Sequence, residues 1–161
     1  MGNRLEKVYQ NVEQAEHIQE TGLIEGRKDG NEIREIKGIL DSMDMDVDED
    51  ILNAIRETRE ASKSEAAAHM DSEVHGTLEQ GYMHANEAIQ EGNEQAQKSR
   101  QAAQEFSRVS GVSEFGRGTA ERSRSNAESL GSQFEQAAES ARQRMEQSEQ
   151  EFSRIRDEIL G

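Results

Sequence analysis

Apolar side chains recur every three or four residues over most of this chain, which is the spacing of one face of an α-helix. One series predicts a long helix over about residues 48–110, and its members are Met70, Val74, Leu78, Tyr82, Ala85, Ile89, Gly92, Ala96, Ser99, Ala103, Phe106 and Ser110. Another predicts a helix over about residues 119–160, with Ser123, Ala127, Leu130, Phe134, Ala137, Ala141, Met145, Ser148, Phe152, Ile155 and Ile159. Such spacing, sustained over many turns, is typical of a coiled coil.

A glycine-rich segment, residues 111–118, separates the two predicted helices, with three glycines in eight residues. Clustered glycines end helices, so we expect a turn there and a long antiparallel helical hairpin. A register that closes the hairpin at this turn sets Phe134 against Ala96 and Leu130 against Ser99. Large residues then face small ones along the seam, as close packing requires.

Two shorter helices are predicted in residues 1–47, ahead of the hairpin at residues 48–161. Apolar residues at helical spacing mark them: Leu5, Val8, Val12, Ala15 and Ile18 in the first, and Ile33, Ile36, Leu40 and Met43 in the second. Between them, Gly26 and Gly30 enclose charged residues and predict a loop. The expected fold is therefore all-α, a helical hairpin or coiled coil preceded by two short helices.

Composition favours helices with little core of their own. Proline is absent, so no residue interrupts a helix by lacking its N–H group. Leu, Ile, Val and Phe together make up only 27 of the 161 residues. The hairpin seam alone would bury little apolar surface, so we expect the N-terminal helices and another chain to complete a three- or four-helix bundle.

The chain is acidic, with 19 Lys and Arg against 34 Asp and Glu and a formal charge of -15. This balance disfavours nucleic acid and anionic membranes as partners, because both attract clustered cations. We find no apolar run long enough for a membrane span and no classical signal peptide. Cysteine is absent, so disulfides and thiolate chemistry are excluded.

The acidic run at residues 41–50 invites a calcium interpretation, but Ile51 stands where a calcium-binding loop needs glycine. We expect Asp46 or Asp48 to cap the helix that follows instead. His69 and Glu73 share a helical face, yet the zinc pattern His-Glu-x-x-His is missing. No motif of nucleophilic or acid–base catalysis occurs either. The sequence therefore predicts a non-enzymatic protein without metal or cofactor.

The hairpin and its turn sequence Phe115-Gly116-Arg117-Gly118 together resemble a known group of proteins. These are the helical-hairpin proteins of bacterial type VII secretion, namely WXG-type proteins, LXG toxin-targeting domains and their helical accessory partners, which place a Trp-x-Gly or similar turn there. The resemblance implies pairing with another helical chain. It also implies a cytoplasmic stage followed by export without a cleaved signal peptide.

We therefore predict a protein-interaction module that forms a helical bundle with another chain, as a heteromer or a homo-oligomer. A secreted or secretion-targeting partner of a type VII-like system is one hypothesis. An acidic phage-type scaffolding protein and a cytoplasmic coiled-coil adaptor are the alternatives. Phe115 either plugs the end of the hairpin or presents its ring to the partner. The predicted partner interface comprises Leu78, Tyr82, Ile89, Phe106, Phe115, Leu130, Phe134, Phe152 and Ile155.

Overall fold

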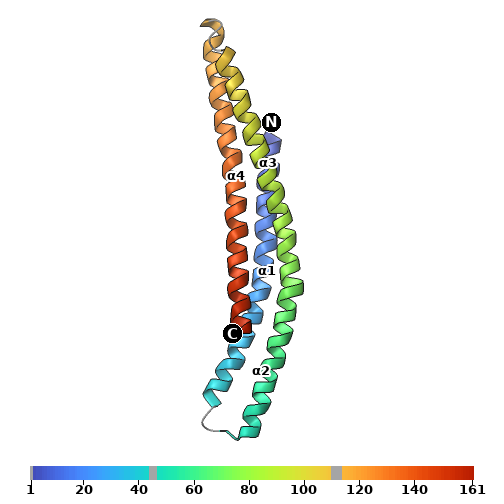
Figure 1. Cartoon of the computed structure of the whole chain (residues 1–161). Helices are drawn as coiled ribbons and strands as arrows, with labels where there is room; N and C mark the ends of the chain where they lie inside the picture. Colours follow the sequence, from blue (N-terminus) through green and yellow to red (C-terminus); the bar gives the residue numbers. More distant parts are fainter. Residues whose placement is uncertain (1, 44–46, 110–113) are drawn as a thin grey trace. The chain divides into compact units, whose positions relative to one another are not determined.

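The chain folds into helices, and the all-α class predicted from the sequence is confirmed. The computed structural model describes residues 2–43, 47–109 and 114–161, and within these ranges there is no strand. The elements are α1 (Gly2–Met43), α2 (Glu49–His69), the π-helical turn η1 (Met70–Val74), α3 (His75–Val109) and α4 (Glu114–Leu160) (Figure 1). From α2 to α3 the helix is continuous, as the sequence predicts for residues 48–110.

Two compact units divide the chain. Unit 1 consists of residues 1–15 and 82–145, and unit 2 of residues 16–81 and 146–161. Helices α1, α3 and α4 contribute residues to both units, whereas α2 and η1 belong to unit 2 alone. Each unit therefore contains three helical segments, one each from α1, from the α2–α3 stretch and from α4.

The predicted loop around Gly26 and Gly30 is wrong, because α1 runs without interruption from Gly2 to Met43. The two short N-terminal helices are therefore one long helix. The reason is that the glycines continue the buried stripe of this helix instead of breaking it. Buried residues follow each other at spacings of three or four through the whole segment: Val8, Val12, Ala15, Gln19, Gly22, Gly26, Gly30 and Ile33.

The glycines of α1 allow large side chains of unit 2 to approach its backbone closely. A Cβ atom at Gly22 would lie 3.2 Å from Leu78, and one at Gly26 would lie 3.0 Å from the Sδ atom of Met70. Glycine costs a helix about 1 kcal/mol relative to alanine. Here the burial of Leu78 and Met70, both fully inaccessible to solvent, offsets that cost.

Within unit 2, cross-helix contacts define the helix directions. Three hydrogen bonds between α1 and α4 join residues 129, 124 and 124 positions apart, namely Gln19 with Ser148, Arg27 with Glu151, and Arg34 with Glu158. A nearly constant separation means that α1 and α4 run in parallel. The α2–α3 stretch runs antiparallel to α1. As the residue number rises along α1 it falls along this stretch, because Gly22 meets Leu78 whereas Gly26 meets Met70. Unit 2 is thus an up-down-up bundle of three helices.

The π-helical turn η1 has a cause in the spacing of the buried residues around it. Ala66, Met70, Val74 and Leu78 are all buried and follow each other in steps of four. In a regular α-helix each four-residue step moves about 40° around the axis, so three such steps would carry the stripe away from the core. A π turn has more residues per turn and keeps these four side chains on one face.

The boundaries of α2 and α4 test two further predictions. Asp48 caps α2, since its side chain accepts a hydrogen bond from the Asp50 amide at 3.4 Å, as predicted. The glycine-rich turn is shorter than predicted, because α4 begins at Glu114 and includes Gly118. Gly118, near the N-terminal end of α4, lowers the stability of the helix only a little in comparison with the contribution of the other residues of this 47-residue helix. Residues 110–113 lie outside the described residues.

The predicted register of the hairpin is confirmed in unit 1 to within one residue. A Cβ atom on Gly92 of α3 would meet Ala138 of α4, and one on Gly131 of α4 would meet Ser99 of α3. As the residue number rises along α3 it falls along α4, so the two helices are antiparallel. Phe134 and Ala96, which the register pairs, belong to the same buried cluster.

The core of unit 1 is narrow. Its buried cluster contains nine residues, six of them alanine: Val8, Val12, Ala15, Ala85, Ala88, Ala96, Phe134, Ala137 and Ala141. Alanine buries little apolar area, so each helical turn contributes little hydrophobic stabilisation. Phe134, at 2% exposure, supplies the one aromatic ring of this cluster.

The core of unit 2 contains larger side chains and one buried polar pair. The large apolar residues of this core include Met70, Val74, Leu78, Ile155 and Ile159, each at most 1% exposed. Between α1 and α4, the Ser148 hydroxyl donates to Oε1 of Gln19 at 3.0 Å, and both residues are buried. A buried polar pair is satisfied only when its two residues are aligned, so this hydrogen bond favours one register of α1 against α4.

Candidate partner-binding surface

A groove lies in unit 1 between α3, α4 and the first turns of α1. In this unit the α3–α4 hairpin continues beyond the N-terminal end of α1 (Figure 1). The volume of the groove is about 840 Å³. The residues that line it come from all three helices: Arg4 and Lys7 of α1; Gln95, Lys98, Ser99, Ala102 and Phe106 of α3; and Ser123, Asn126, Ala127, Leu130 and Phe134 of α4. The first turns of α1 form one end of the groove, and α3 and α4 form its two sides.

The apolar lining of the groove is concentrated on the facing sides of α3 and α4. Phe106 is 37% exposed. Leu130 is half-buried and packs against the unit 1 core, while Phe134 forms the inner boundary. Ala102 and Ala127 leave space between these larger residues.

The charged residues of the groove are all cations. Arg4, Lys7 and Lys98 line it, and no carboxylate is among its described lining residues. Lys98 contacts Glu94 of the same helix at 3.2 Å, with both side chains more than half exposed. Exposed pairs of this kind contribute at most about 1 kcal/mol, so Lys98 is readily released to another carboxylate.

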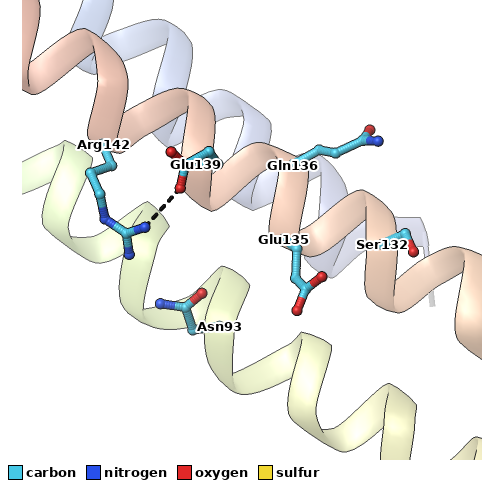
Figure 2. A pocket seen from close by; sticks show the side chains of 6 residues that line it. All are labelled: Asn93, Ser132, Glu135, Gln136, Glu139 and Arg142. Atoms are coloured by element: carbon cyan, nitrogen blue, oxygen red, sulfur yellow. Dashed lines mark hydrogen bonds and ion pairs between the residues drawn. The ribbon is translucent and has the colours of Figure 1, made fainter.

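A second depression between α3 and α4 is polar and has a different character. It holds about 470 Å³ and is lined by Asn93, Ser132, Glu135, Gln136, Glu139 and Arg142. Figure 2 shows that Arg142 donates to Glu139, at 2.7 Å, and that Gln136 points away from the other side chains. Glu135 also forms an ion pair with Arg100. These groups are solvated or paired within the chain, so this depression is a polar surface between two helices.

The structure brings together three of the nine residues predicted for the partner interface. Phe106, Leu130 and Phe134 meet at the groove of unit 1. Also in unit 1, Tyr82 is half-buried and Ile89 packs against the core.

The remaining predicted residues lie elsewhere. Leu78 and Ile155 are buried in the core of unit 2, where they stabilise the fold. Phe152 is half-buried, with its ring centroid 5.6 Å from that of His75. Phe115 belongs to the first turn of α4, and its side chain is outside the described part of the structure.

Sequence reasoning did not identify the cations of the groove. Arg4 and Lys7 lie three positions apart on one helical face, which was the available signal. Their relation to Lys98 follows only from the position of α1 beside α3 and α4. Ala127 was part of the predicted seam, and Ala102 precedes the seam residue Ala103. The sequence did not indicate that these two small residues line a groove.

A cluster of ionisable side chains in unit 2 connects α1 with His69 at the end of α2 and with Glu73 of η1. His69 contacts Asp29 through Nδ1 and Glu73 through Nε2, the latter at 3.0 Å. The predicted shared face of His69 and Glu73 is thereby confirmed, whereas Asp29 had been assigned to a loop. The hydrogen bond to Asp29 raises the pKa of His69 above its usual 6.5, against the lowering effect of burial, with further support from the charges of Asp29, Glu73 and Glu25.

Folding stability should depend on the protonation of His69. Because its pKa is higher in the folded state, the protonated imidazole stabilises the fold below pH 6.5, and this contribution disappears as pH rises through the raised pKa. We expect the difference in unfolding free energy between the wild type and His69→Asn to be largest at pH 6 and to shrink toward pH 9. Urea denaturation at a series of pH values measures it. Asp29→Asn should reduce the same pH dependence, since Glu73 and Glu25 still raise the pKa of His69, and an unchanged profile in either variant would contradict the prediction.

Within the described residues, no helix has an apolar stretch long enough to cross a membrane. No group of three or more His, Cys, Asp or Glu side chains in the described ranges could hold a metal ion. No protein-family model, curated protein or solved structure matches this chain.

Proposed function

We propose that this chain is a non-enzymatic protein-interaction module that binds a helix of another protein in the groove of unit 1. The observation that carries the proposal is the groove itself, which has apolar side chains from α3 and α4 along its length and, within the described part of unit 1, no helix over them. Apolar grooves between two helices are a common docking site for an amphipathic helix.

The internal packing of unit 1 supports this proposal. Over residues 2–15 of α1, three helices share the alanine-rich core. Where α1 ends, α3 and α4 continue as a pair, and Phe106 stays 37% exposed. A third helix at this position would bury Phe106 and Leu130 and would extend the three-helix arrangement that the rest of the unit already has.

We further propose that the partner belongs to a type VII-like export system, with this chain cytoplasmic before export and then secreted. The support is the resemblance of the α3–α4 hairpin and of Phe115-Gly116-Arg117-Gly118 to the helical proteins of such systems. A phage-type scaffold and a coiled-coil adaptor would use the same groove with other partners. The identity of the captured chain distinguishes these functions.

Affinity capture of the tagged full chain from its native host, followed by mass spectrometry, tests the proposal. Phe106→Glu places a charge in the groove and should abolish capture of the partner. Met83→Glu is the matched control, because Met83 is 65% exposed on the same helix and in the same unit but does not line the groove. Circular dichroism should show both variants to be as helical as the wild type.

The outcomes separate the alternatives. A helical secretion protein or toxin lost only in Phe106→Glu supports the type VII-like function, and a major capsid protein lost in the same way supports a scaffold. Equal capture by the wild type and both variants would contradict binding in the groove. A stable homodimer that forms without another chain, measured by analytical ultracentrifugation, would contradict the heteromeric function.

A further inference from the structure

We infer that the occupant of the unit 1 groove is an acidic amphipathic helix of a partner protein, about four turns long, with large apolar residues along one face. This inference rests on the proposed function and adds the chemistry of the partner. It follows from the length of the groove, the sizes of the residues that line it and the sign of their charges.

The length of the groove defines how much helix it holds. On α3 the lining runs from Gln95 to Phe106, and on α4 from Ser123 to Phe134. Both stretches contain twelve residues, which corresponds to about 18 Å of helix. A docked helix that also contacts Arg4 and Lys7 at the end of α1 would need about fifteen residues, or about four turns.

The sizes of the lining residues indicate what the partner supplies. Ser99 and Ala102 on α3, together with Ser123 and Ala127 on α4, form a floor of small side chains. In the core of unit 1, a large side chain packs among small ones, since Phe134 shares its buried cluster with six alanines such as Ala96. The same rule applied to this floor requires large apolar residues on the partner, spaced by three and four.

The charged residues of the groove indicate the sign of the charge that the partner helix carries. The groove presents Arg4, Lys7 and Lys98 and, among its described lining residues, no carboxylate. Acidic residues beside the apolar face of a docked helix would meet these cations, and complementarity of this kind determines specificity and association rate.

A second copy of this chain is a poorer occupant. In a two-fold symmetric dimer the same surface meets itself, so the cations of one groove would face those of the other. The positive groove of an acidic protein is therefore better matched by an acidic helix from a different chain.

Binding of two synthetic helical peptides to the full chain tests the inference. Both carry Leu and Ile at spacings of three and four over about four turns and an internal staple that holds the helix. One has Glu and the other Lys at the positions flanking the apolar face. Fluorescence anisotropy at low salt should give a Kd at least about tenfold lower for the Glu peptide, and added salt should reduce this difference because it screens the charges.

Variants of the protein assign the effect to the groove. Phe106→Glu should abolish binding of the Glu peptide, and Met83→Glu should leave it unchanged. The double variant Lys7→Glu, Lys98→Glu should reverse the preference toward the Lys peptide. Both lysines are exposed, so the fold should tolerate these changes, and circular dichroism checks this.

Each remaining outcome would overturn the inference. Equal binding of the two peptides, preference of the wild type for the Lys peptide, or binding of neither would exclude an acidic helix as the occupant. Dimerisation of the wild type that Phe106→Glu prevents would identify a second copy instead. If the peptides fail but Phe106→Glu still abolishes capture of the native partner, the proposed interaction function stands and only the chemistry of the partner is wrong.

Discussion

Phe134→Ala is expected to lower the free energy of unfolding by about 3–5 kcal/mol, the range measured when buried phenylalanines are truncated. Phe134 is 2% exposed and lies in a core cluster where six of the nine members are alanines. The alanines of this cluster cannot move into the space left by the ring, and Leu130 and Met145, which pack against the cluster from its periphery, can fill it only in part. The cavity would therefore remain largely open, and the loss of stability should be near the upper end of this range. Urea denaturation followed by circular dichroism measures it.

Phe106→Ala is the matched control for this prediction. It removes the same ring from the other helix of the hairpin, but from a position that is 37% exposed. We expect a loss of about 1–2 kcal/mol, because more than a third of the residue already contacts water and no closed cavity is left behind. Equal effects of the two substitutions would mean that Phe134 does not lie in the core and that the register of α3 against α4 is wrong.

The register could be predicted because large and small residues alternate across the seam of the hairpin. Phe134 needs a small partner, and only certain alignments place Ala96 and Gly92 beside it. Periodicity alone would have allowed α4 to slide by one turn against α3. Steric complementarity at a few positions therefore carried more information than the hydrophobic pattern as a whole.

The single helix α1 was not predicted, because a glycine in a helical sequence can either end the helix in a loop or allow another helix to pack closely against it. Gly26 and Gly30 surround charged residues, as the glycines of a loop do. In the structure they continue a stripe at helical spacing and face Met70 and Ile155. Glycines spaced by four, in phase with the stripes on both sides, indicate close helix packing. That phase was visible in the sequence and should have outweighed the composition of the segment.

The groove could not be predicted from periodicity, because it depends on where one helix stops beside two others. Phe106 and Leu130 were recognised as apolar seam residues. Whether they are buried depends on the position of residues 2–15 of α1 beside α3 and α4 in unit 1, where Arg4 and Lys7 line the groove. That position follows from tertiary contacts, for which the sequence offered no signal.

Substitutions of two glycines in α3 are expected to change stability in opposite directions. A Cβ atom on Gly92 would lie 2.8 Å from the carbonyl oxygen of Phe134 and 3.0 Å from the Cβ atom of Ala138. Neither of these atoms is at the end of a flexible side chain, so α3 and α4 would have to separate. At Gly76 a Cβ atom would meet nothing within 4 Å.

Gly76→Ala should therefore stabilise the chain by about 0.5–1 kcal/mol, since alanine is the better helix former and nothing opposes it. Gly92→Ala gains the same helical preference but forces the helices apart, at a cost of about 1–3 kcal/mol typical of overpacked cores. Gly92→Val adds two more methyl groups at the contact and should be worse than Gly92→Ala. Thermal and urea unfolding of the three variants would establish the order. If Gly92→Ala were as stabilising as Gly76→Ala, the close contact between α3 and α4 at this position would be excluded, and with it the register on which the groove of unit 1 depends.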